Sequence, residues 1–146
     1  MINIICLGKI KEQYLKDLIK DYEKRISKYH KINIIELKDT NNLEEEKENI
    51  LKYIKPNDYI ISLCIEGKIL TSQELASTIE ESFNHYSTID FIIGSSNGLS
   101  QDLKDKSNLL LSFSKMTFPH GLFRGILLEQ IYRSFKIINN EQYHKW

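Results

Sequence analysis

The sequence predicts an α/β fold: an open, mainly parallel sheet of five or six strands with helices on both of its faces. Short apolar runs alternate along the chain with longer stretches in which apolar residues recur at helical spacing. Strands that alternate with helices in this way pair in parallel through right-handed crossovers. The length of 146 residues is that of one ordinary domain, so we expect a single domain over residues 1–146.

Each predicted strand is a short apolar run that ends near a turn signal. Gly8 follows the first run, Glu66 and Gly67 follow the third, and a turn bounded by two glycines follows the fourth. The predicted strands are Ile2–Leu7, Ile32–Leu37, residues 59–65, Ile89–Ile93 and residues 109–113.

The predicted helices begin and end at recognisable capping residues. Thr71 and Glu74 have the spacing of a capping box, Ser100 can cap a short helix, and the turn at Pro56 ends the second helix. We expect the acidic residues of the segment before Ile50 to face solvent. The predicted helices cover residues 12–28, residues 43–54, a stretch from Thr71 that carries Leu75, Ile79 and Phe83 inward, residues 100–106 and residues 122–138.

Composition and charge narrow the class of protein. The net charge is zero, which argues against a purely electrostatic nucleic-acid binder, although residues 9–31 carry eight Lys and Arg against four Asp and Glu. No apolar run approaches the roughly 18 residues that cross a bilayer, and the N-terminal residues lack the features of a signal peptide. Cys6 and Cys64 lie in apolar runs, which predicts buried free thiols, and the four histidines lack zinc-ligand spacing. We expect a cytoplasmic protein without a dedicated metal site.

In parallel sheets, ligands bind outside the carboxyl ends of the strands. Here those ends are residues 63–67, 94–98 and 113–120. The last of these connects strand to helix with three large apolar side chains, which can form a wall for a flat ligand. The chain terminus, residues 142–146, combines two aromatic rings, an imidazole and a cation, a composition that suits contact with an RNA nucleotide.

The Gly-Ser-Ser-Asn-Gly turn at residues 94–98 has three interpretations. It is a plain tight turn, a place where the backbone approaches a ligand closely, or the G-x-S-x-G elbow of a serine hydrolase. The short chain and the lack of an HGGG-type segment argue against the hydrolase. That enzyme would use Ser96 as nucleophile, with Asp102 or Asp105 and His120 or His144 as its partners.

Several ordered motifs carry a family resemblance over essentially the whole chain. They are Ile-Ile-Cys-Leu-Gly-Lys-Ile-Lys-Glu at residues 4–12, Gly-Lys at 67–68 with Leu-Thr-Ser at 70–72, Phe-Ile-Ile-Gly-Ser-Ser-Asn-Gly-Leu at 91–99, Leu-Ser-Phe-Ser-Lys-Met-Thr-Phe-Pro-His at 111–120, Glu-Gln-Ile-Tyr-Arg at 129–133 and Tyr-His-Lys at 143–145. In these motifs the chain resembles the large-subunit rRNA (pseudouridine-1915 N3)-methyltransferases, the RlmH type of SPOUT enzymes.

The resemblance implies a C-terminal deep trefoil knot whose loops hold S-adenosylmethionine. It also implies a homodimer with a shared active site, which methylates N3 of a pseudouridine in 23S rRNA on the assembled ribosome. The chain departs from the family at Ser95, where a second glycine is common, and at Trp146, which follows the Tyr-His-basic triplet. The cofactor residues carried over by the resemblance are Leu63, Gly94, Phe113, Ser114, Lys115, Met116, Thr117 and Phe118.

We assign candidate catalytic roles on the chemistry of the acceptor, because N3 of the ring must lose a proton. His144 is the leading candidate base, Tyr143 stacks on or orients the acceptor, and His120 is the alternative base. Arg124 and Arg133, together with Lys145, would hold phosphates or stabilise the ionised ring. A non-catalytic nucleotide- or RNA-binding module on a flavodoxin-like sheet is the rival interpretation.

Overall fold

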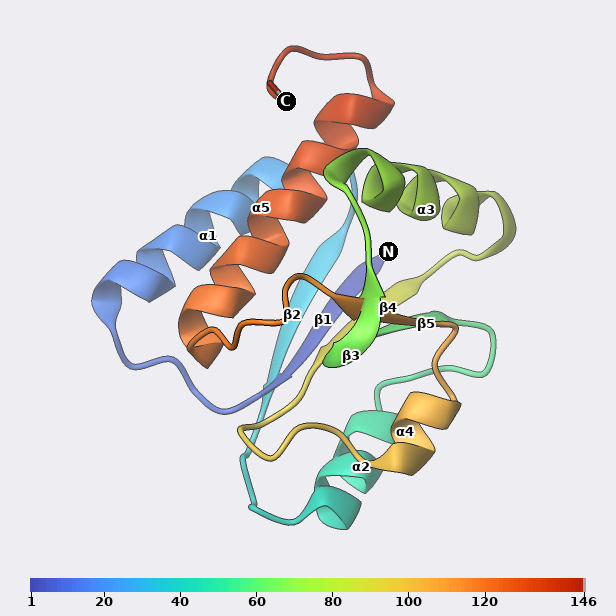
Figure 1. Cartoon of the computed structure of the whole chain (residues 1–146). Helices are drawn as coiled ribbons and strands as arrows, with labels where there is room; N and C mark the ends of the chain where they lie inside the picture. Colours follow the sequence, from blue (N-terminus) through green and yellow to red (C-terminus); the bar gives the residue numbers. More distant parts are fainter. Residues whose placement is uncertain (146) are drawn as a thin grey trace.

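A computed structural model describes residues 1–145 and shows five strands in a single parallel sheet (Figure 1). The strand order is β2-β1-β4-β3-β5, so the chain places its fourth strand between its first and third. Every strand pair is parallel. The strands are β1 (Ile2–Leu7), β2 (Ile32–Leu37), β3 (Tyr59–Ile69), β4 (Ile89–Ile93) and β5 (Leu109–Ser112).

Helices cover both faces of this sheet, which confirms the predicted fold class. Figure 1 shows α1, α3 and α5 together on one face and α2 and α4 on the other. The trefoil knot implied by the resemblance stays a prediction. The helices are α1 (Gln13–Ser27), α2 (Leu43–Leu51), α3 (Ser72–His85), α4 (Gln101–Asp105) and α5 (His120–Ile138).

The strands divide their side chains between two hydrophobic cores. In β1, Ile2, Ile4 and Cys6 pack with the apolar faces of α1, α3 and α5, whereas Ile5 and Leu7 pack toward α2 and α4. Successive strand side chains point to opposite faces, so a strand covered on both sides reads as a continuous apolar run. Each such buried aliphatic side chain contributes about 1.5–3 kcal/mol of transfer free energy.

Strand β3 is longer than the sequence predicts, because it continues through Gly67 to Ile69. The pairing of β3 with β5 shifts register between Leu63 and Lys68. At Gly67, a Cβ atom would lie 2.7–2.8 Å from backbone atoms of Leu110 and Leu111. Gly67 therefore allows close approach of two strands rather than ending one, and its interpretation as a strand end was wrong.

Helix ends follow the predicted capping residues with small shifts. The Thr71 hydroxyl accepts from the Glu74 N–H at 3.1 Å, and the Glu74 carboxylate accepts from the Thr71 N–H at 2.8 Å, which confirms the capping box. Helix α2 ends at Leu51, three residues before the predicted end. Helix α5 begins at His120, two residues before the predicted start, with Pro119 at the N-cap.

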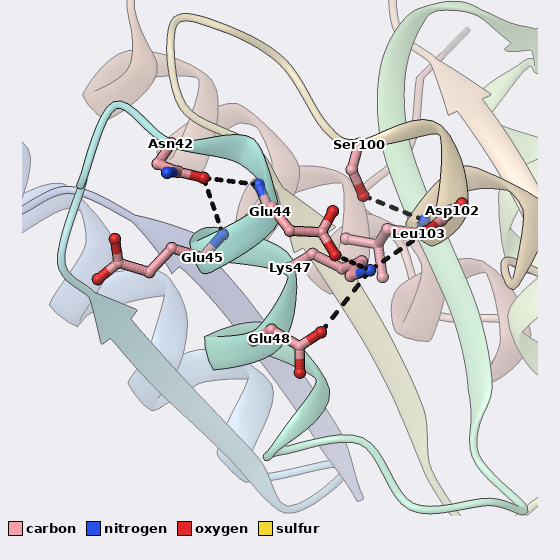
Figure 2. A network of polar contacts seen from close by, with 8 residues as sticks. All are labelled: Asn42, Glu44, Glu45, Lys47, Glu48, Ser100, Asp102 and Leu103. Carbon is pink, nitrogen blue, oxygen red and sulfur yellow. Dashed lines mark hydrogen bonds and ion pairs between the residues drawn. The ribbon is translucent and has the colours of Figure 1, made fainter.

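A polar network joins α2 to α4 (Figure 2). The Asn42 side chain caps α2 by accepting from the N–H groups of Glu44 and Glu45, each at 3.1 Å. The Lys47 ammonium, whose side chain is only 9% exposed, pairs with Glu44 and lies 3.2 Å from Asp102 on α4. This cation therefore fixes the short helix that follows the 94–98 turn.

The acidic residues before Ile50 were expected to face solvent, but one of them is buried. Glu46 is 1% exposed, and its carboxylate accepts from the Thr40 N–H at 3.0 Å and from the Ser95 hydroxyl at 3.2 Å. Leu43, Glu46 and Ile50 lie at helical spacing, so all three fall on the inner face of α2. The expectation was wrong for Glu46 because helical position outweighed residue type.

Both cysteines are free thiols, but only one is fully buried. Burial raises the pKa of Cys6 to about 11, whereas Cys64 is partly exposed, contrary to the prediction. Within residues 1–145, none of the helices combines the length and apolarity needed to traverse a bilayer. The same residues contain no group of three or more His, Cys, Asp or Glu placed to hold a metal ion.

Candidate functional site

A cavity of about 410 Å³ opens at the carboxyl ends of β4 and β5 and beside residues 63–65 of β3. Chemistry was predicted at these segments. His120, at the head of α5, lines the same cavity, and so do Cys64 and Phe123. Lys115 is the one predicted cofactor residue that does not line it. The predicted cofactor residues that do are Leu63, Gly94, Phe113, Ser114, Met116, Thr117 and Phe118.

The turn after β4 brings backbone close to this cavity. A Cβ atom at Gly94 would lie 2.5 Å from the Gly98 carbonyl oxygen, so only glycine fits there. Gly98 has φ +79°, and its N–H donates to the Ser95 carbonyl at 2.9 Å. Among the described residues, Ser95 is not one of the non-glycine positions with positive φ. The departure from glycine at position 95 therefore costs no left-handed strain.

Glu46, on α2, supports this turn through Ser95. Its carboxylate holds the Ser95 hydroxyl, and that hydroxyl in turn accepts from the Asn97 N–H at 3.3 Å. Because Glu46 is buried, these hydrogen bonds act in a low-dielectric environment and fix the turn firmly. Glu46 was not among the predicted site residues, although its helical spacing from Leu43 could have revealed it.

Aromatic side chains form one wall of the cavity. Phe113 meets Phe123 edge-on with ring centroids 5.1 Å apart, and Phe118 stacks on Phe123 at 6.0 Å. Met116 is 75% exposed at the rim. The Ser114 hydroxyl accepts from the Met116 N–H at 3.0 Å and so shapes the loop. Such a wall suits a flat, largely apolar ligand.

The C-terminal tail folds back along α5 and is anchored by Glu129. The Tyr143 hydroxyl donates to the Glu129 carboxylate at 2.7 Å, and Arg133 donates to the same carboxylate at 2.8 and 3.2 Å. The Arg133 guanidinium also lies 4.8 Å from the centre of the Tyr143 ring. Burial and the Glu129 carboxylate raise the pKa of Tyr143, so this phenol stays neutral. Glu129 lies in the Glu-Gln-Ile-Tyr-Arg motif at residues 129–133, but the sequence predicted no role for this carboxylate.

His144 joins this cluster through both ring nitrogens. Its Nδ1 lies 3.0 Å from the Arg133 guanidinium, and its Nε2 lies 2.9 Å from the Gln73 side-chain amide on α3. A guanidinium can only donate, so Nδ1 accepts and the proton of the neutral ring lies on Nε2. The Gln73 atom at 2.9 Å is the amide nitrogen, also a donor, so this contact is a hydrogen bond only with the amide turned to present its oxygen to Nε2. The structure thus brings Tyr143, His144 and Arg133 together. Lys145 is exposed, and Trp146 lies outside the described residues.

The tail cluster and the cavity are apart within one chain. His120 and Arg133 belong to the same helix, α5, and thirteen residues of α-helix separate them by about 20 Å along its axis. Figure 1 shows the C-terminus at the end of α5 away from its start. The two candidate bases, His120 and His144, therefore do not share a site in one chain.

Arg124 lies in neither cluster. It is 2% exposed, its guanidinium pairs with Glu36 at 2.6 Å, and it donates to the Gly8 carbonyl at 3.1 Å. These contacts tie α5 to the carboxyl ends of β1 and β2. Within residues 1–145 its Nε has no hydrogen-bond partner.

The hydrolase arrangement is not assembled. Ser96 and His120 line the same cavity, but no hydrogen bond among the described residues links Ser96 to a histidine. Asp102 is paired with Lys47, and Asp105 accepts from Gln101 at 2.8 Å on the surface of α4. A Ser-His-Asp triad needs these groups in one hydrogen-bonded series.

Comparison with known proteins agrees with this geometry. The family model described as predicted SPOUT methyltransferase matches residues 1–144. A protein of Methanococcus vannielii is 52% identical over 157 aligned positions that cover 99% of each chain. The ribosomal RNA large subunit methyltransferase H of Clostridium botulinum strain Hall is 50% identical, with the same coverage.

Solved structures share the fold at low sequence identity. A probable methylase family protein from Haemophilus influenzae superposes with a TM-score of 0.59 at 12% identity, covering 99% of this chain and 70% of that one. The SpoU methyltransferase AviRb from Streptomyces viridochromogenes gives 0.52 at 9% identity, covering 97% and 62%. Family model, relatives and fold agree, and the chain belongs to the SPOUT methyltransferase family.

Proposed function

We propose that the chain is an S-adenosylmethionine-dependent methyltransferase that acts in the cytoplasm on N3 of a pseudouridine in 23S rRNA, on the assembled ribosome. The observation that carries the proposal is the cavity at the carboxyl ends of β4 and β5 and beside residues 63–65 of β3, lined by nearly all the residues that the resemblance assigns to the cofactor. Relatives about half identical over their full length are named as large-subunit rRNA methyltransferases.

The residues of the cavity fit this cofactor. Its volume of about 410 Å³ lies within the range of roughly 300–1,000 Å³ that small-molecule sites occupy. Phe113 and Phe118 offer an apolar face to an adenine ring, and Gly94 lets the backbone approach without a side chain. When bound, S-adenosylmethionine supplies an electrophilic methyl group on a sulfonium. The protein's main contribution is then to position donor and acceptor in line.

The acceptor nitrogen must also be deprotonated. If its pKa lies roughly two to three units above 7, ionising N3 costs about 3–4 kcal/mol at neutral pH. His120, which lines the cavity, can accept this proton in the same chain. His144 can accept the proton only if the tail of one copy reaches the cavity of another copy. Arg133, already held beside His144, would then stabilise the ionised ring.

A homodimer would resolve the distance between tail and cavity. If the α5 helices of two copies pack antiparallel, the end of one helix lies beside the start of the other. The cluster of Tyr143, His144 and Arg133 of one copy would then approach the cavity of its partner. A dimer also doubles the basic surface that meets phosphates, which a chain of zero net charge needs. The knot that the resemblance implies would form the floor of each cavity.

The experiment incubates purified protein with radiolabelled S-adenosylmethionine and ribosomes from a strain that lacks this methylation, followed by nuclease mapping of the label. We expect label at N3 of the large-subunit pseudouridine, with intact ribosomes preferred over free 23S rRNA. His120→Ala and His144→Ala, compared in single turnover, then identify the base. Donor binding without any transfer to ribosomes would contradict the proposed substrate, and failure to bind the donor would contradict the proposal as a whole.

A further inference from the structure

A second cavity, of about 440 Å³, adjoins the first at the head of α5. His120 lines both cavities and so forms part of their shared boundary. The second cavity lies between the loop after β1 and the first turn of α5. Its floor is apolar, with Leu7, Ile10 and Leu15, and Leu122 stands at its edge, 41% exposed.

The polar groups of this second cavity include both donors and acceptors. Lys9 supplies a cation, while Glu12 and Asp39 supply carboxylates. Pro119, at the N-cap of α5, offers no side-chain acceptor, and the first helical bond runs from the Phe123 N–H to the Pro119 carbonyl at 2.9 Å. The backbone N–H groups of the first turn are therefore free to donate. A purely anionic ligand would meet two carboxylates here, so the cavity suits a neutral ligand with both donors and acceptors.

Arg124 adds a buried cation to the lining of this cavity. It lines the second cavity, its side chain is 97% buried (3% exposed), and its Nε has no partner among residues 1–145. Buried donors are rarely left unpaired, because an unpaired donor costs about 1–3 kcal/mol. The Nε itself is shielded from solvent, so a ligand in the cavity would reach this donor only after the Arg124 side chain shifts.

We propose that this second cavity receives the uracil-type ring of the acceptor nucleotide, with the ring edge toward Lys9 and Asp39 and the ring face against Tyr14. The inference rests on the proposed function and gives it an acceptor pocket. A pseudouridine ring carries two carbonyl groups and two N–H groups, and the cavity offers both donors and acceptors to meet them. Tyr14, 72% exposed at the opening, presents a ring on which a base can stack.

The position of the cavity agrees with the chemistry. Methyl transfer needs the acceptor nitrogen within about 3–3.5 Å of the methyl carbon, so the acceptor pocket must adjoin the donor pocket. The second cavity does adjoin it, and the boundary carries an imidazole, His120. A base bound there would present N3 to both the donor and this histidine.

Two variants test the proposal on the full-length protein. Leu122→Trp fills the second cavity, and Tyr14→Ala removes the stacking ring. Tyr53, 46% exposed beyond α2 and outside both cavities, provides the matched controls Tyr53→Trp and Tyr53→Ala. The readouts are the Kd for S-adenosylmethionine by calorimetry, the KM and kcat for ribosome methylation, and the oligomeric state by light scattering.

We expect both variants to lower kcat/KM for ribosomes by about tenfold or more, the scale of one lost base stack. The donor Kd, the oligomeric state and both Tyr53 controls should match the parent protein. Parent-like kcat/KM in both variants would overturn the acceptor pocket while leaving the proposed function intact. Loss of the dimer in either variant, with parent-like activity per remaining dimer, would assign the cavity to a contact between copies. That result would also overturn the acceptor pocket. Failure of the parent protein to methylate ribosomes would instead reject the proposed function.

Discussion

Asp90 gives the sharpest prediction about stability. It lies fully buried near the amino end of β4, where its Oδ1 accepts from the Asn3 side-chain amide at 2.9 Å. Its other oxygen has no hydrogen-bond partner within residues 1–145. Burial, followed by the nearby Asp58 carboxyl, raises the pKa of Asp90 from 3.8 to about 7. The folded protein therefore holds a proton on Asp90 that the unfolded chain releases at much lower pH.

The sign of the pH dependence follows directly. Between pH 4 and 7 the folded state binds more protons than the unfolded state, so the free energy of unfolding falls as pH rises. The rise of pKa from 3.8 to about 7 corresponds to at most about 4 kcal/mol, at 1.36 kcal/mol per pH unit. Asp58 shares the titration, so we expect a loss of about 2–4 kcal/mol for the pair. Asp90→Asn removes the charge and should be more stable than the parent by about this amount at pH 8.

The assay is urea unfolding followed by circular dichroism at intervals from pH 4 to pH 8.5. His30, whose pKa burial lowers, acts in the opposite direction near neutral pH, so the difference between parent and Asp90→Asn isolates the contribution of Asp90. Asp105→Asn, a surface carboxylate on α4, is the matched control and should leave the parent's pH profile unchanged. Parallel profiles for the parent and Asp90→Asn would refute the reasoning, and so would a difference that grows toward low pH.

Three further substitutions test the site. Gly94→Ala forces a methyl group to 2.5 Å from the Gly98 carbonyl oxygen, and calorimetry should show donor affinity reduced by about tenfold or more, or 1.4 kcal/mol. Glu46→Ala leaves the Ser95 hydroxyl without its buried acceptor; thermal melts should show a loss of about 2–4 kcal/mol, with weaker donor binding, whereas Glu46→Gln should lose less. Tyr143→Phe frees the tail from Glu129 and should lower kcat for ribosome methylation while the donor Kd stays unchanged. A matching loss of kcat and of donor affinity would contradict the separation of tail and cavity.

The sheet and its helices could be predicted because their signals are local. In β1, alternate residues serve two different cores, and a strand buried on both faces appears in the sequence as an unbroken apolar run. The capping box at Thr71 is likewise contained in four consecutive residues. The cavity lining followed from the rule that ligands bind at the carboxyl ends of parallel strands, with the residues supplied by the family resemblance.

The contacts that the sequence did not reveal all join segments that are distant along the chain. Gly67 was interpreted from its neighbours as a strand end, yet its role depends on how closely β5 approaches. Glu46 looked like one more solvated acid, yet burial on α2 makes it the support for a turn 49 residues later.

The same reasoning applies to the catalytic candidates. His120 and His144 are equally plausible bases in the sequence, and only the length of α5 shows that they cannot serve one cavity in one chain. His120 lies at the cavity, whereas His144 lies in the tail beside Arg133, about 20 Å along α5 from His120. The two histidines therefore give different expectations for a mixed dimer. Copies that carry His144→Ala combined with copies that carry Gly94→Ala should regain one site with parent-like kcat/KM if the tail acts across the interface. They should stay as impaired as the separate variants if each chain uses only its own residues.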